Sequence, residues 1–144
     1  MFSKACEYGI KAILYIAFQS QQGSRVSLKN IAHATDSPEA FTAKILQQLA
    51  RSGIIRSAKG PTGGFDIDEK EMDRITLGHI VKAIDGDGLY TGCGLGLKDC
   101  NELRPCPVHH KFKSIRQEMK LMLDKTTMQE MINGLNNGST FLRL

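Results

Sequence analysis

Apolar residues recur every three or four positions in several stretches of the chain, a spacing that places them along one side of an α-helix. The first stretch covers residues 3–19 and predicts an amphipathic opening helix. Two further helices are predicted over residues 27–35 and 38–52. Ser37 is a suitable N-cap for the second of these, and Pro38 suits the first helical position. The N-terminal part is therefore expected to be mainly helical.

Two short runs of β-favouring residues follow the third predicted helix. They cover residues 54–57 and 64–67, and they flank the sequence AKGPTG, a basic tip rich in glycine and proline. Helix, turn, helix and hairpin in this order are typical of a winged helix-turn-helix domain. Many small domains with the same order of helices and hairpin do not bind DNA. DNA binding must therefore be inferred from the exposed residues of these elements.

Three more helices are predicted in the rest of the chain. Thr76 caps a helix over residues 76–85, residues 107–123 form the longest helix, and the sequence TMQE opens a short last helix. The long helix could pack on its own domain. A long, late helix in a small DNA-binding chain is also the usual way to build a two-fold dimer. Its apolar side carries Phe112, Ile115, Met119 and Met122.

The expected fold is mainly α with a small β-hairpin wing, a winged helix-turn-helix joined to a long C-terminal dimerisation helix. We expect three parts: a DNA-binding domain over residues 1–85, a cysteine-rich loop over residues 86–106, and the dimerisation helix and tail over residues 107–144.

Charge is distributed unevenly along the 144 residues. Residues 1–65 carry eight Lys/Arg and three Asp/Glu, giving +5, whereas residues 66–144 carry eleven and twelve, giving −1; together these make the net +4. A basic N-terminal half suits a polyanion such as DNA, although a solvated surface would show the same asymmetry. No apolar run approaches the ~18 residues of a membrane span, so a cytoplasmic protein is expected.

The N-terminal half of helix 38–52 presents small and polar side chains on the side opposite its apolar face. In helix-turn-helix proteins this half reaches base edges, and Lys44 and Gln47 can donate hydrogen bonds to bases or phosphates. The candidate contacts to double-stranded promoter DNA are Ser37, Glu39, Ala40, Thr42, Ala43, Lys44 and Gln47 from this helix, with Arg56, Lys59, Gly60 and Thr62 from the hairpin.

Three of the four cysteines lie in one segment rich in glycine and proline. Six residues separate Cys93 from Cys100, five separate Cys100 from Cys106, and His109 follows three positions later. Cysteines in a chain of cytoplasmic type more often bind metal or react with oxidants than form structural disulfides. The backbone around these residues is flexible enough for the three thiolates to converge on one ion or cluster.

Four interpretations of this segment compete. Three cysteines and a histidine satisfy a zinc site, but zinc ligands usually come in close pairs, and only Cys106 and His109 are close. An iron–sulfur cluster accepts wider spacing and can take histidine as a ligand. A thiol switch without metal is the third, with Lys98 or Arg104 lowering a cysteine pKa. The fourth is a loop with inert cysteines.

An enzyme is not expected. The chain lacks the Cys-x-x-Cys pair of thiol oxidoreductases, a βαβ pattern and a phosphate-binding loop.

Seven segments spread over nearly the whole chain are specific when taken together. They are EYGIKAILYIA, the pair LKNIAHAT and SPEAFTAKILQQLARSGII, GPTGGF, TLGHIVKAID, the three-cysteine loop, and CPVHHKFKSIRQEM. With these segments the chain resembles the Rrf-type bacterial transcription regulators, a family that includes the iron–sulfur cluster regulator and the nitric-oxide-sensing repressor. The resemblance implies a homodimer with winged heads and a long crossed helix pair.

The resemblance also implies a ligand set. Cys93, Cys100 and Cys106 match the three cluster cysteines, and His109 matches the histidine that completes a [2Fe-2S] site in the iron–sulfur cluster regulator. In other members an acidic residue of the partner's first helix is the last ligand, and Glu7 occupies that position. A [2Fe-2S] cluster is preferred, with [4Fe-4S] as the alternative. The first cysteine gap is one residue longer than in those relatives.

The function expected from the sequence is that of a homodimeric transcription regulator controlled by a cluster in the 93–106 loop. It would bind a pseudo-palindromic promoter site, and redox state, iron–sulfur status or nitric oxide would reorder the loop and change the spacing of the heads. The alternative is the same DNA-binding fold switched by cysteine thiol chemistry or structural zinc.

Overall fold

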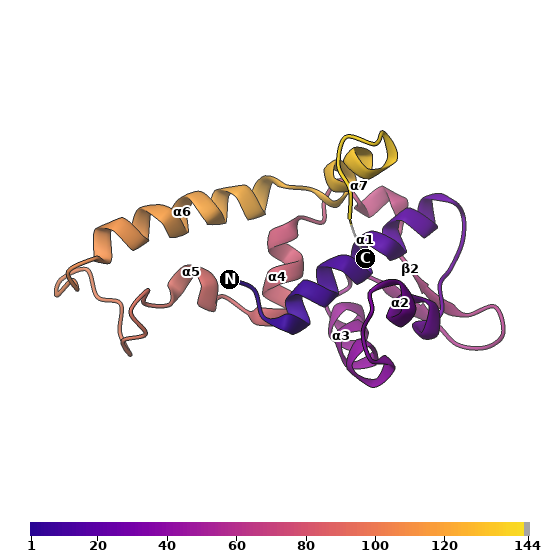
Figure 1. Ribbon diagram of the computed structural model, residues 1–144, viewed down its shortest axis with the longest axis horizontal. Helices are drawn as coiled ribbons and strands as arrows, with labels where there is room; N and C mark the ends of the chain where they lie inside the picture. Colours follow the sequence, from indigo (N-terminus) through magenta and orange to yellow (C-terminus); the bar gives the residue numbers. More distant parts are fainter. Residues whose placement is uncertain (143–144) are drawn as a thin grey trace.

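A computed structural model describes residues 1–142 and shows a mainly helical chain with one small hairpin (Figure 1). Its elements are α1 (Lys4–Gln21), α2 (Leu28–Ala34), α3 (Glu39–Arg51), β1 (Arg56–Ala58), β2 (Gly64–Asp66), the 3-10 helix η1 (Glu69–Glu71), α4 (Leu77–Asp85), α5 (Gly88–Thr91), α6 (His109–Lys125) and α7 (Met128–Asn136). The expected fold class, mainly α with a β-hairpin wing, is confirmed.

Helix α1 forms the centre of the fold. Ser3 caps it by accepting a hydrogen bond from the backbone N–H of Cys6. Its apolar side packs against α2, α3, α4 and α7, and as a result Ile13, Ile16 and Ala17 are fully buried. The core beneath it gathers residues from almost every element, including Ile31, Leu46, Leu49, Met72, Ile80, Met128 and Ile132.

Helices α2 and α3 pack against each other and against α1, as the helix-turn-helix pattern predicts. Ser27 caps α2 through its side chain. The predicted start of the next helix is wrong by one residue. Helix α3 begins at Glu39 with Pro38 as N-cap, and the hydroxyl of Ser37 bonds that of Thr42 instead of capping the backbone.

The wing is an antiparallel pair in which Arg56 lies opposite Asp66 and Ala58 opposite Gly64. Its inner strand is extended by a bridge between Val26 and Phe65, which ties the hairpin to the chain before α2. Gly64 has φ +120, and a Cβ there would lie 2.6 Å from the carbonyl oxygen of Val26. Only glycine allows both this conformation and this close approach.

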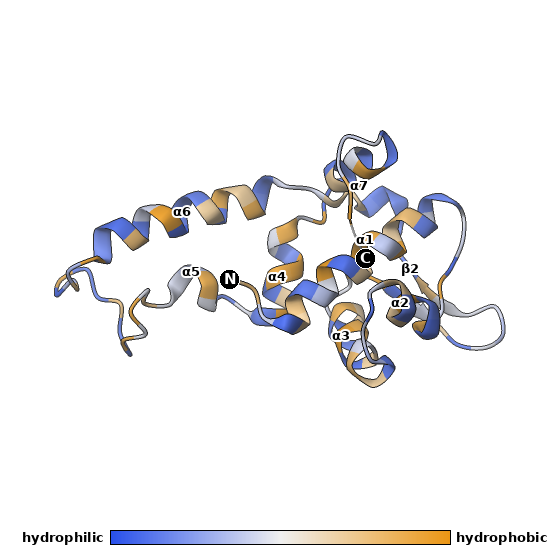
Figure 2. Ribbon diagram, viewed as in Figure 1, coloured by the Kyte–Doolittle hydropathy of each residue, from blue (hydrophilic) through white to orange (hydrophobic). Residues whose placement is uncertain are grey.

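Helix α6 extends away from the winged head, and α4 lies between it and α1 (Figure 1). Leu123 anchors it by packing with Cys6 and Val81. Apolar and polar residues alternate along α6 (Figure 2). Part of its apolar side is left uncovered by the described residues, 1–142: Ile115 is 56% exposed and Met122 is 48% exposed. The sequence did not predict α5, a single turn beside α6.

Within residues 1–142, the helices all fall short of the length and apolar character that crossing a membrane would need.

Candidate DNA-reading surface and cysteine loop

The first half of α3 presents a set of exposed side chains on one side of the helix. Glu39, Ala40, Lys44 and Gln47 are exposed, and Ala43 is half-buried. Small residues near the helix start allow close approach to a groove, and the amide of Gln47 can reach a base edge. Glu39, Ala40, Lys44 and Gln47 therefore lie on the exposed side of the helix, where the sequence placed them.

Thr42 does not belong to this surface. The sequence placed it on the exposed side, but it is only 2% exposed. Its hydroxyl donates to the carbonyl oxygen of Pro38 at 2.9 Å and also contacts the hydroxyl of Ser37, which in turn contacts Thr35. The hydroxyl is satisfied locally, so a polar residue fits inside the turn between α2 and α3. Both Thr42 and the half-buried Ser37 act as internal braces of that turn.

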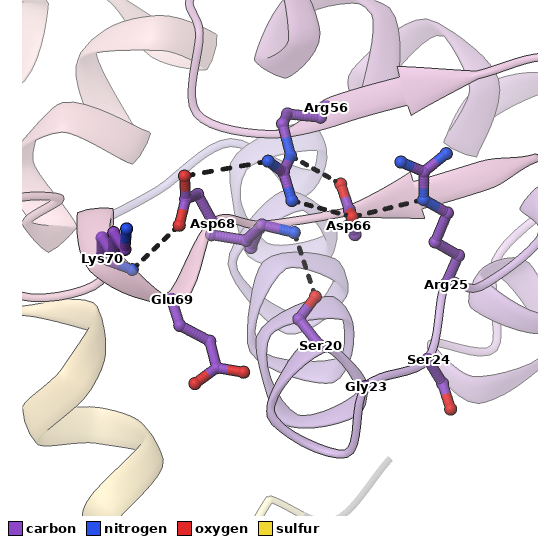
Figure 3. Close-up of a pocket in the computed structure, with 10 residues that line it drawn as sticks. Ser20, Gly23, Ser24, Arg25, Arg56, Asp66, Asp68, Glu69 and Lys70 are labelled. Carbon is purple, nitrogen blue, oxygen red and sulfur yellow. Dashed lines mark hydrogen bonds and ion pairs between the residues drawn. The ribbon is translucent and has the colours of Figure 1, made fainter.

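Arg56, which the sequence grouped with the DNA contacts of the hairpin, lies away from the hairpin tip. It begins β1 at the base of the wing, where its Nε and Nη2 atoms each donate to a carboxylate oxygen of Asp66 at 2.9 Å. Asp66 also pairs with Arg25, and Arg56 lies 3.7 Å from Asp68 (Figure 3). This bidentate pair holds the wing in place. Its guanidinium is thus engaged in ion pairs at the base of the wing, although its side chain remains 57% exposed.

The true tip of the wing is formed by Lys59, Gly60, Pro61 and Thr62, which are all exposed. Gly60 has φ +94 and shapes the tight turn there. Because its neighbours are small, the Lys59 cation can closely approach the phosphate backbone of DNA.

Sequence reasoning missed the role of Arg25. It precedes Val26, the residue that bridges to β2, and so it is carried to the base of the wing. There it lines an open cavity of about 440 Å³ with Arg56, Asp66 and Lys70 (Figure 3). Burial alone would raise the pKa of Asp66, but hydrogen bonds and charge from Arg56 and Arg25 outweigh burial and lower it. The signal available in the sequence was the basic residue next to the β-favouring Val26.

The cysteine loop lies directly along α6. Gly94 sits against the ring of Phe112, where an added Cβ would be 2.5 Å from the nearest ring carbon. Gly96 has φ +71 and turns the chain, consistent with the flexibility expected there. An ion pair between Glu102 and Lys113 fastens the far part of the loop to the same helix. All three loop cysteines are free and partly buried.

Cys100 and His109 are brought together by this arrangement. Their Sγ and Nδ1 atoms are 3.4 Å apart, and Nη2 of Arg116 lies 3.5 Å from the same sulfur. His109 begins α6 and is only 3% exposed. Its Nε2 atom is buried without a hydrogen-bond partner among residues 1–142. A buried imidazole nitrogen without a partner is costly, so this nitrogen is suited to a ligand or a rearranged contact.

Cys93 lies elsewhere in the loop. The pKa of its thiol is lowered, first by the backbone N–H groups of Leu95 and Leu97 and further by the Cys106 side chain and the charge of Arg116. The backbone N of Leu95 lies 3.4 Å from the sulfur. Of the four predicted ligands, Cys100 and His109 are thus in direct contact. Across residues 1–142, no three His, Cys, Asp or Glu side chains are gathered closely enough to hold a metal ion.

Glu7, the alternative ligand, lies in the first turn of α1. Its carboxylate pairs with Lys4 at 2.7 Å, and this hydrogen bond is the main reason that its pKa is lowered. Its side chain is 39% exposed, so it is available to a second chain.

The residues of the loop fit the chemistry of an iron–sulfur group. Three thiols and an imidazole are the donor types that hold such clusters, and the nitrogen of His109 that lacks a partner is the kind of buried atom that a metal would satisfy. A cavity of about 350 Å³ opens beside Cys100 and His109, between α5 and α6.

Comparison with known proteins gives a consistent result. Residues 2–134 match the family described as Rrf2, iron-dependent transcriptional regulator. A protein of Aquifex aeolicus named as an HTH-type transcriptional regulator is 32% identical over 135 residues, which is 92% of each chain. Two solved structures share the fold. CymR (YrzC), the global cysteine regulator of B. subtilis, has a TM-score of 0.77 at 23% identity over 92% of this chain and 96% of its own. IscR of T. potens has a TM-score of 0.74 at 19% identity over 99% and 93%.

Proposed function

The chain belongs to the Rrf2 family of transcriptional regulators and is not an enzyme; from this premise we propose that it is a homodimer whose affinity for promoter DNA is set by an iron–sulfur cluster bound in the 93–106 loop. The observation that carries the proposal is the position of the loop. It holds three free cysteines, lies along α6, and brings Cys100 against the buried His109.

Cys93, Cys100 and Cys106 would hold the cluster, with His109 as fourth ligand and Glu7 of a second chain as the alternative. When bound, the cluster supplies a group whose charge and integrity respond to electrons, oxidants or nitric oxide. A [2Fe-2S] cluster is preferred because an imidazole lies beside a ligand sulfur. The chain's own part is to hold the sulfurs near α6 and to keep His109 away from water.

The DNA contacts would come from α3 and the wing tip. Glu39, Ala40, Ala43, Lys44 and Gln47 face outward on α3, and Lys59, Gly60 and Thr62 are exposed at the tip. Two heads related by a two-fold axis would match the halves of a pseudo-palindromic promoter site. Helix α6 supports the dimer because Ile115 and Met122 are exposed on a helix that extends beyond its own domain.

Regulation requires a route from the loop to the heads. Helix α6 packs on α4, and α4 packs on both α1 and α3. A change in how the loop rests on α6 can therefore shift the heads. A coupling of about 1–3 kcal/mol would change promoter occupancy by roughly 5–150-fold.

The first test is an absorbance spectrum with iron and sulfide counts on protein purified without oxygen. A brown protein with visible bands is expected, and the iron count per chain separates two-iron from four-iron clusters. A protein that stays colourless after anaerobic reconstitution would remove the cluster from the proposal.

The second test uses Cys100→Ala. This variant should lose the cluster and bind promoter DNA as the cluster-free protein does, with no response to cluster removal. The measurement is fluorescence anisotropy on labelled promoter DNA with and without prior chelation. A variant that still responded as fully as wild type would contradict the mechanism.

The second candidate function keeps the fold and replaces the cluster with thiol chemistry or structural zinc. It is favoured by one observation: the backbone N–H of Leu95 contacts the Cys93 sulfur, and the backbone N–H groups of Leu95 and Leu97 lower the pKa of this thiol. A colourless protein whose DNA affinity changes on mild oxidation would support thiol chemistry. A colourless protein with one tightly held zinc per chain would support the structural site.

A further inference from the structure

Arg116 occupies a special place on α6. It is partly buried, and its Nη2 atom donates to the sulfur of Cys100 at 3.5 Å. The Nδ1 atom of His109 lies 3.4 Å from the same sulfur. The Cys100 sulfur therefore contacts two residues of the same helix. This makes Arg116 the polar contact between the middle of the cysteine loop and α6.

The neighbouring cations of α6 are engaged differently. Lys113 pairs with Glu102, and Lys120 pairs with Asp124. Within residues 1–142, Arg116 has no carboxylate at salt-bridge distance. A guanidinium offers five N–H donors and remains charged at all ordinary pH values. Most of its hydrogen-bonding capacity is thus available to sulfur atoms of the loop.

The surroundings favour a negative group at this position. Arg116, Lys113 and Lys120 line the 350 Å³ cavity together with Cys100 and His109. Thiolates that ligate metal carry negative charge, and a partly enclosed guanidinium stabilises such charge more strongly than an exposed cation does. Groups just outside a ligand set orient the ligands and tune the metal.

We propose that Arg116 is a positioning residue that fixes the Cys100 sulfur on α6 and thereby stabilises the ligand set of the 93–106 loop. The part of this inference that concerns a cluster rests on the proposed function. The part that concerns the loop itself applies to the cluster-free protein. Because Arg116 sits on the helix that also carries the exposed Ile115, it links the state of the loop to the proposed dimer helix.

Three variants test this inference. Arg116→Ala removes the contact, and Arg116→Lys keeps the charge but replaces the planar fork with a compact ammonium. Arg104→Ala is the matched control, because Arg104 is an exposed arginine of the same loop. It removes the same charge without touching the Cys100 contact.

The first measurement is hydrogen exchange of the cluster-free protein. In Arg116→Ala, the backbone amides of residues 93–106 should exchange faster than in wild type. In Arg116→Lys the exchange rate should be intermediate, and in Arg104→Ala it should match wild type. Exchange in the helices α1 to α4 should be unchanged in all variants, which excludes general unfolding. Wild-type exchange of the loop in Arg116→Ala would overturn the inference.

The second measurement is made on the loaded protein. A chelator should remove the visible absorption of Arg116→Ala more readily than that of wild type. We expect the variant to hold its cluster with an affinity about 10–100-fold weaker, as expected for loss of a supporting hydrogen bond. Its reduction potential should move to more negative values, because a nearby cation favours the added electron. An unchanged affinity and potential, or an equal change in Arg104→Ala, would overturn the inference.

The two measurements separate this inference from the proposed function. A wild-type protein that carries no cluster contradicts the proposed function, while the exchange experiment still decides whether Arg116 holds the loop.

Discussion

The four cysteines show how strongly local surroundings change one residue type. Cys6 is fully buried, and burial, followed by the nearby Asp85, raises the pKa of its thiol to about 12. Such a thiol stays protonated and behaves as a small apolar core residue. Cys93 is partly exposed, and backbone N–H groups lower its pKa. In the sequence, Cys6 differs from the loop cysteines only by its position. In the structure it also differs in burial and in the pKa of its thiol.

Asp66 gives a pH-dependent prediction at the same scale. Its pKa is lowered in the folded protein by Arg56 and Arg25, which outweigh the effect of burial. The ion pairs of Asp66 therefore contribute their full stabilisation at pH values above the ordinary carboxyl pKa of about 3.9. This stabilisation is lost as pH falls through the lowered pKa of Asp66 in the folded protein. Asp66→Asn should reduce the free energy of unfolding by about 1.5–3 kcal/mol near neutral pH. The measurement is urea unfolding of both proteins over a pH series.

The difference between the two proteins should shrink only at pH values below about 3.9. Asp73→Asn is the control, because Asp73 is exposed and should change stability little at any pH. A difference between wild type and Asp66→Asn that stayed constant down to the lowest pH would rule out the ion pairs as its cause.

At the scale of elements, most boundaries could be predicted from periodicity and capping residues. Helix α4 was expected over residues 76–85 and spans Leu77–Asp85, and α6 was expected over 107–123 and spans His109–Lys125. These signals are local, so one sequence suffices to find them. The single turn α5 has no such signal, because its ends are Asp-Gly and Gly-Cys sequences typical of loops.

Errors arose where a polar residue is satisfied by its neighbours. Thr42 seemed to belong outside because it is polar, yet its hydroxyl bonds Ser37 and Pro38 inside the turn. The Nδ1 of His79 likewise accepts from the backbone N–H of Thr76 at 3.0 Å and completes a capping box. The spacing of Thr76 and His79 was a usable signal for that contact.

Helix α3 carries the prediction that belongs to this scale. Lys44→Ala should weaken binding to all DNA sequences alike. It should also make the fall of log affinity with log salt concentration less steep, by the amount expected for about one lost phosphate contact. Gln47→Ala should cost about 1–3 kcal/mol on the promoter sequence and much less on unrelated DNA, since an amide reads base edges. The measurement is fluorescence anisotropy on both DNAs at several salt concentrations.

Lys29→Ala on the exposed side of α2 serves as a comparison for Lys44, because it removes one charge outside the recognition helix. Equal losses for Lys44→Ala and Gln47→Ala on promoter and unrelated DNA would show that α3 makes only backbone contacts. A Gln47→Ala protein with unchanged promoter affinity would remove this residue from the reading surface.

At the scale of the whole molecule, the sequence indicated which residues could bind a cluster but not how the chain arranges them. Spacing alone cannot show that Cys100 contacts His109. That contact depends on how the loop folds back on α6, through the contact of Gly94 with Phe112 and the ion pair of Glu102 with Lys113. These contacts join residues 11 and more positions apart, beyond the reach of periodicity.

The exposed side of α6 leads to a prediction about assembly. Ile115 and Met122 are seven residues apart, so they lie on the same side of the helix, and they are 56% and 48% exposed. Their burial against a second copy would remove apolar surface from water, at roughly 25 cal/mol per Å². Ile115→Glu would place a charge in that contact, so we expect a monomer or a dimer at least about ten-fold weaker, since a buried unpaired charge costs several kcal/mol. The measurement is sedimentation equilibrium over a range of concentrations.

Leu121→Glu is the matched control for this variant. Leu121 is as exposed as Ile115, at 56%, but at 100° per residue it lies on a different side of α6 from Ile115 and Met122. It should leave the dimer intact. Because a pseudo-palindromic site needs two joined heads, Ile115→Glu should also lose affinity for the full promoter site while keeping its affinity for a half site. A dimeric Ile115→Glu protein would show that the two heads are joined through another surface.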